Sequence, residues 1–167
     1  RVRGDLWQFP FADNRAGEFQ VTAQVRDVTF AYVPRSLQPE PPAWPALTQL
    51  AGELVFQGHG MAVRGATAQI VGAPRLQVRA DAQIADFNHS QVRVQARVRG
   101  PLSESLAYVN ATPLGGMIGQ SLARAAATGP ADVDLQLSLP LAALERSQVQ
   151  GTVTLAGNDL QVMPDTP

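Results

Sequence analysis

Strict alternation of apolar and polar residues is the feature that most constrains how this chain can fold. Between residues 75 and 84, Leu, Val, Ala or Ile takes every second position, and Arg, Gln or Asp takes the others. Residues 91–99 and 132–139 repeat the pattern. Successive side chains of a β-strand point to opposite faces, so this period predicts long strands that are apolar on one face and polar on the other.

Irregularities in the alternation predict where strands bend and turn. The pattern runs from Glu18 to Arg26, slips by one position at Asp27 and resumes at Val28, which predicts a β-bulge within one bent strand. Short Gly-rich or Asn-containing segments separate the other strands and are typical of tight turns. Three hairpins are therefore expected, and they join residues 52–56 to 61–71, 76–84 to 92–98, and 149–155 to 160–162.

Two segments break the strand pattern. Residues 34–45 contain five prolines and form a Pro-rich connector, because proline cannot donate regularly to a sheet ladder. Residues 102–127 carry apolar side chains at helical intervals after Ser103 and Glu104, which suit a helix start. The expected fold is mostly β: a long, curved antiparallel sheet, a β-groove or taco-like shape, of about eight strands with one helical insertion near residues 102–127.

The chain reads as one β module over residues 1–167 and as a fragment of a larger protein. It begins at Arg1, and it shows neither an export signal nor an apolar run near the ~18 residues that a spanning helix needs. We expect any membrane anchor to lie outside these residues.

Composition excludes several kinds of chemistry. The absence of cysteine rules out disulfides, thiolate metal sites and a cysteine nucleophile. A charged fraction of 16% and a net charge of −1 argue against nucleic-acid binding through dense Lys and Arg. His59 and His89 lie in predicted turns without companions at metal-ligand spacing, so we expect no metal and no cofactor.

Carboxylates that share a strand face are the one sequence feature that suggests an enzyme. Asp132 and Asp134 share a strand face, where the continuation through Gln136 and Ser138 favours an ordinary polar face. A sugar-acting enzyme would need two carboxylates across a cleft, and Asp81 is the only further plausible supplier. We therefore expect a protein that is not an enzyme.

The apolar face itself is the remaining candidate site. The pattern alone is compatible with a sandwich core, a sheet covered by a helix, or a surface that shields acyl chains. Residues alone leave these three readings open.

Short motifs occur in order along nearly the whole chain: Trp44-Pro45, residues 50–61, residues 99–102 leading into 108–114, residues 137–141 and residues 149–153. Each motif is weak alone, and their joint order is more specific. The set resembles the YhdP family of AsmA-like, TamB-related bacterial envelope proteins.

The resemblance implies a segment of a large Gram-negative protein that is anchored in the inner membrane and extends through the periplasm. Such proteins are similar to bridge-like lipid carriers, in which stacked β units hold phospholipid acyl chains in an apolar groove, and this transport supports the outer-membrane barrier. Implied partners are phospholipid, neighbouring β units of the same full-length chain and envelope proteins. The alternative role is a structural or assembly-assisting module for outer-membrane proteins.

Residues two positions apart on a strand share a face, and this strand parity gives the candidate site residues. The expected groove-lining residues are Phe19, Val21, Phe30, Leu54, Phe56, Leu76, Val78, Ile84, Val92, Val94, Val133, Leu135, Leu137 and Val153. The helical insertion would plug or cap the groove, or pack outside it, through Leu106, Met117, Ile118 and Leu122.

Overall fold

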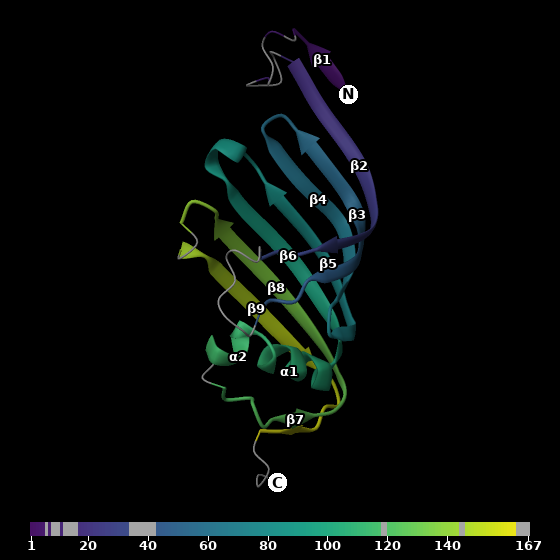
Figure 1. Cartoon of the computed structure of the whole chain (residues 1–167), viewed down its shortest axis with the longest axis vertical. Helices are drawn as coiled ribbons and strands as arrows, with labels where there is room; N and C mark the ends of the chain where they lie inside the picture. Colours follow the sequence, from purple (N-terminus) through teal and green to yellow (C-terminus); the bar gives the residue numbers. More distant parts are fainter. Residues whose placement is uncertain are drawn as a thin grey trace.

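The computed structural model describes residues 1–5, 7, 11, 17–33, 43–117, 120–143 and 146–162. They form one eight-stranded antiparallel sheet that is not closed, and its strands follow one another in chain order (Figure 1). The expectation of a mostly β fold with about eight strands is confirmed. The strands of this sheet are β1 (Val2–Gly4), β2 (Gly17–Phe30), β3 (Leu47–Gln57), β4 (Gly60–Ile70), β5 (Ala73–Ile84), β6 (Gln91–Pro101), β8 (Pro130–Pro140) and β9 (Gln148–Leu155).

Two of the three expected hairpins are present. Strands β3 and β4 pair across the turn that follows Gln57, and β5 and β6 pair without a register shift from Gln77–Arg99 to Ile84–Val92. The turn between β5 and β6 contains a short 3-10 helix, Phe87–His89. The side chain of Asp86 caps this helix by accepting a hydrogen bond from the backbone N–H of Asn88. Most of the Pro-rich connector, residues 34–42, lies outside the described residues.

The expected hairpin at residues 149–162 is wrong. Strand β9 pairs with β8, whereas β10 (Leu160–Gln161) pairs with β7 (Ala126–Ala127) in a separate two-stranded sheet. The side-chain amide of Asn158 explains the difference, because it donates to the carbonyl oxygens of Thr128 at 2.8 Å and Pro130 at 2.9 Å. These bonds direct the chain away from β9, so no described strand pairs with the outer edge of β9.

The parity slip in β2 is a β-bulge, as predicted. The register shifts between Val25 and Val28, and Asp27 adopts a positive φ of 53°. Strand β4 has its own shift at Gly65, whose φ is 56° and whose N–H donates to the Asp81 carboxylate at 2.8 Å. Bulges bend a strand and increase its local twist. Figure 1 shows β2 bending at mid-length, and its last residues pass in front of the sheet.

The helical insertion is shorter than residues 102–127. Helix α1 spans Leu102–Asn110 and α2 spans Pro113–Met117, whereas residues 120–124 form turns. Pro113 limits α1 because it lacks the N–H that would continue the helix. Figure 1 shows both helices in front of the lower part of the sheet, so the insertion lies on one face.

Close packing beside α1 makes Gly100→Ala a test of the fold. A Cβ at Gly100 would lie 2.6 Å from the carbonyl oxygen of Arg75 and 2.7 Å from a Leu76 methyl carbon. We expect Gly100→Ala to lower the free energy of unfolding by about 1–3 kcal/mol, as overpacking does. Urea unfolding followed by circular dichroism measures this change. Gly116→Ala is the control, because a Cβ there meets nothing within 4 Å; equal stability of the two variants would contradict the packing.

Candidate functional site: the apolar face of the sheet

Register across the sheet places apolar side chains of six or seven strands on one face, which we call the apolar face. Each residue lies directly opposite the next in its row, so the rows cross the sheet without a polar interruption. One row is Val21, Phe56, Met61, Ile84, Val92 and Leu139. The next row is Ala23, Leu54, Val63, Ala82, Val94, Leu137 and Val149.

All fourteen residues expected from parity fall on this face or at its ends. Val78, Val133 and Val153 form a further row together with Val98, and Leu135 lies between this row and the second one. Phe19 and Phe30 lie at the two ends of β2. The candidate list left out Leu139 and Val149, although each alternates with a chosen residue of its own strand. It also left out Met61 and Val63, which the register of β4 with Phe56 and Leu54 would have found.

Much of the apolar face is open. Val92, Val94, Leu135 and Leu137 are only half-buried although they lie in the middle strands, and Val153 is 56% exposed. The described residues contain no second large sheet that could pack over them. A sandwich core is therefore not what this part of the chain forms, and an exposed apolar area of this kind marks an interaction surface.

The lower end of the same face is covered by α1. Ile70, Ala73 and Leu76 form a buried cluster, and Tyr108 of α1 packs against it. Leu76 is only 2% exposed, in contrast to the half-buried residues of the open part. Leu76, expected to line a groove, thus lies beneath the helix.

A second cluster holds the start of α1. Leu102 and Leu106 are buried with Ala131 of β8, and Leu122 packs against them from the turn that follows α2. Leu106 and Leu122 were expected as helical cover, and both face this cluster. Ile118 and the side chain of Met117 lie outside the described residues.

An ion pair ties α1 to β5. The guanidinium of Arg75 and its backbone N–H both contact the Glu104 carboxylate at 2.8 Å. The side-chain hydrogen bond from Arg75 holds the pKa of Glu104 below its usual value, with support from the backbone N–H. Glu104 also lies in the first turn of α1, where a negative charge is favourable. The helix is thus attached to the sheet by polar as well as apolar contacts.

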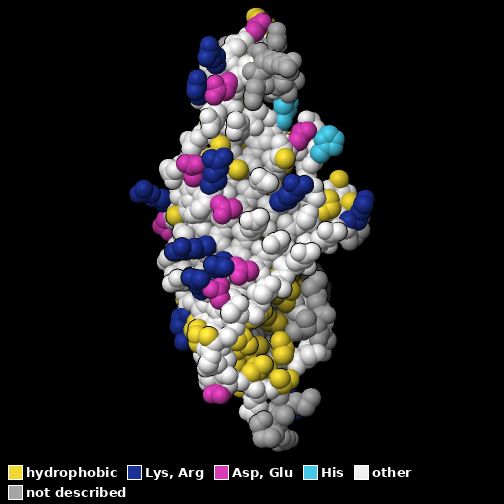
Figure 2. All heavy atoms as spheres, turned by 180° about the vertical axis from the view of Figure 1, so that it is seen from behind, with side chains coloured by type: hydrophobic (Ala, Val, Ile, Leu, Met, Phe, Trp, Pro, Cys, Tyr) yellow, Lys and Arg dark blue, Asp and Glu magenta, His cyan; other side chains and the backbone are white. Residues whose placement is uncertain are grey.

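The opposite face of the sheet is polar. Arg97 contacts Asp134 at 2.7 Å and Arg99 contacts Asp132 at 2.7 Å, in both cases between β6 and β8. The Arg97 hydrogen bond holds the pKa of Asp134 below its usual value. Figure 2, seen from behind, shows Arg, Asp and Glu side chains spread over the middle of the molecule and hydrophobic ones gathered lower down. Of the carboxylates considered for sugar chemistry, Asp132 and Asp134 are therefore paired with arginines of the neighbouring strand, and Asp81 accepts a hydrogen bond from the backbone N–H of Gly65.

Two hollows are lined by polar residues together with residues of the apolar face, Leu135 in one and Phe19 in the other. One, of about 450 Å³, has polar-face residues such as Arg79, Asp81 and Gln95 in its lining. Another, of about 500 Å³, lies at the upper end near Phe19 and His59.

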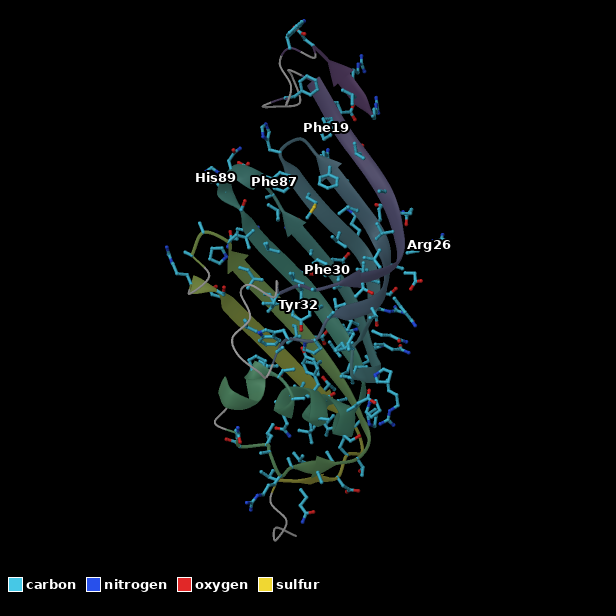
Figure 3. All side chains as sticks on the ribbon, viewed as in Figure 1. Phe19, Arg26, Phe30, Tyr32, Phe87 and His89 are labelled. Carbon is cyan, nitrogen blue, oxygen red and sulfur yellow. The ribbon has the colours of Figure 1, made fainter. Side chains whose placement is uncertain are left out.

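Metal-binding geometry is not found in the part of the chain that the structure describes. His89 contacts Asp86 at 3.2 Å in an exposed turn, and no group of three His, Cys, Asp or Glu side chains comes together among the described residues. Figure 3 shows His89 at the tip of the sheet, far from the two helices.

Comparison with known proteins places the chain in a family. The model of the YhdP protein family matches residues 1–167. This chain belongs to the YhdP family. It is 31% identical over 164 residues to the intermembrane phospholipid transporter YhdP of Escherichia coli (strain K12), a match that covers 96% of this chain.

The match covers 12% of the E. coli YhdP protein, so the chain corresponds to a small part of that transporter. No solved structure matches. Within the described residues, no helix is long and apolar enough to cross a membrane.

Two leucines on the apolar face test how much of it is open. We expect Leu76→Ala to lower the free energy of unfolding by about 2–5 kcal/mol, since Leu76 is buried under α1. The same substitution at half-buried Leu137 should cost less than half as much, because less surface leaves water on folding. Urea unfolding of the two variants gives the comparison. An equal loss at both positions would mean that the upper part of the face is covered.

Proposed function

We propose that this chain is a periplasmic segment of an inner-membrane-anchored protein that carries phospholipid between the inner and outer membranes and so supports the outer-membrane barrier. Its apolar face shields the acyl chains during passage. The observation that carries this proposal is the run of apolar rows across six or seven strands, over which the described residues place no second layer. The name of the E. coli relative, an intermembrane phospholipid transporter, supplies the cargo.

The energetics of acyl chains suit such a face. Removing a CH₂ group from water contributes about 0.8 kcal/mol, so a chain laid along the face is stabilised over much of its length. Strand β8 has 11 residues, and a rise of about 3.3 Å per residue gives it a length of roughly 36 Å. One leaflet of a bilayer core is about 15 Å thick. A strand of this length therefore exceeds the span of one acyl chain.

The outer edge of β9, with which no described strand pairs, supports contact with a neighbouring β unit of the same full-length chain. β9 lies at the end of the strand order, and all eight of its residues are exposed. Its sequence contains neither proline nor charge, the usual devices that protect a sheet edge.

The same edge favours a second candidate function, a structural or assembly-assisting module for outer-membrane proteins. An extended client segment could add to β9 as a further strand, with main-chain hydrogen bonds supplying the affinity. Under this function, protein contacts at β9 would matter and lipid contacts on the apolar face would not.

Photo-crosslinking in cells separates the two functions. p-Benzoylphenylalanine placed at Val94 or Leu135 of the full-length protein should recover phospholipid, because these residues lie on the open apolar face. Gln95 and Gln136, the next residues along the same strands, point to the polar face and serve as matched controls. Mass spectrometry of the adducts is the readout. Adducts with envelope proteins and no lipid at Val94 and Leu135 would overturn lipid carriage.

A further inference from the structure

Both tyrosines of the chain meet over the apolar face. The hydroxyl oxygens of Tyr32 and Tyr108 are 3.1 Å apart, although the two residues are 76 positions apart in sequence. Tyr32 follows the end of β2, which bends across the front of the sheet, and Tyr108 belongs to α1. Figure 3 shows Phe30 and Tyr32 in front of the middle of the sheet.

The rings of this pair have apolar and aromatic surroundings. Tyr108 packs against the cluster of Ile70, Ala73 and Leu76, while the ring of Tyr32 lies edge-on to Trp44 with centroids 6.2 Å apart. The pair therefore stands where the part of the apolar face under α1 meets the open part. Tyrosine and tryptophan suit such a boundary, since each combines an apolar body with a polar tip.

Hydrogen-bond counting leaves one donor unused. Two phenols bring two O–H donors, and the bond between Tyr32 and Tyr108 uses one of them. No other hydrogen bond of either hydroxyl occurs among the described residues. Burial raises the pKa of both phenols, most strongly that of Tyr32, so both keep their protons at neutral pH. The second O–H is thus a donor beside an apolar surface, and the described residues offer it no acceptor.

We propose that the Tyr32–Tyr108 pair is a hydrogen-bond site for an acceptor oxygen of the bound phospholipid, either an ester carbonyl or a phosphate oxygen. The inference rests on the proposed function, because it assumes acyl chains on the open part of the apolar face. A lipid whose chains lie there brings oxygens that accept hydrogen bonds and carry no donor of their own. The pair supplies the missing donor and fixes where the polar end of the lipid stops relative to α1.

Tyr32→Phe/Tyr108→Phe tests this site, since it removes both hydroxyls and keeps both rings. Binding to the purified full-length protein is measured with three ligands: a diester phosphatidylcholine, its diether analogue without carbonyls, and a diacylglycerol without phosphate. If the acceptor is an ester carbonyl, the variant should bind the diester lipid and the diacylglycerol about five- to tenfold more weakly and the diether lipid unchanged. If it is a phosphate oxygen, both phosphatidylcholines should weaken and the diacylglycerol should not.

Other outcomes overturn the proposal. Unchanged binding of all three ligands means that the hydroxyls bind no lipid oxygen, and an equal loss for all three means that the pair is only a structural contact between β2 and α1. Thr152→Val, which removes an exposed hydroxyl from the polar face of β9, is the control and should change none of the affinities. Failure of the unmodified protein to bind any of the ligands would instead overturn the proposed lipid carriage.

Discussion

The rest of this structure depends on one constraint: neighbouring strands must pair in the register that places their alternating apolar residues opposite one another. Because a strand reverses its side chains at every residue, a pairing error of one position would move a whole row to the wrong face. Strands β5, β6 and β8 pair without a register shift. In β2 the apolar pattern slips by one position, and the bulge at Asp27 compensates for the slip, so that Val28 lies on the same face as Val25. The result is a sheet with one apolar face and one face that carries ion pairs.

Helix α1 divides the apolar face into two parts with different roles. Beneath it, Leu76 and Ile70 are buried as in an ordinary core and stabilise the fold. Above it, residues such as Val94 stay half-exposed, and their contribution to stability is smaller. The residues that stabilise the fold and those that would carry lipid under the proposed function therefore lie on the same strands, at the lower and upper parts of the sheet, and the tyrosine pair lies at the boundary.

Sequence predicted the parts of the fold that local chemistry decides. The slip at Arg26-Asp27 predicted the bulge, and the turn at Gly58 predicted the hairpin of β3 and β4. The hairpin after β9 failed because a side chain, that of Asn158, decides the path of the chain there. The Tyr32–Tyr108 contact joins distant segments and has no local signal. The sequence also could not predict that the apolar face is open, because the strands of a sandwich core show the same alternation of apolar and polar residues.

Spin-label accessibility at Leu137 of the full-length protein in isolated cell envelopes tests the central claim most directly. Lipid on the apolar face predicts frequent collisions of the label with oxygen, which dissolves in acyl chains, and rare collisions with a polar nickel chelate. Frequent nickel collisions would mean that water fills the face. Rare collisions with both reagents would mean that protein covers it, and either result would contradict the account.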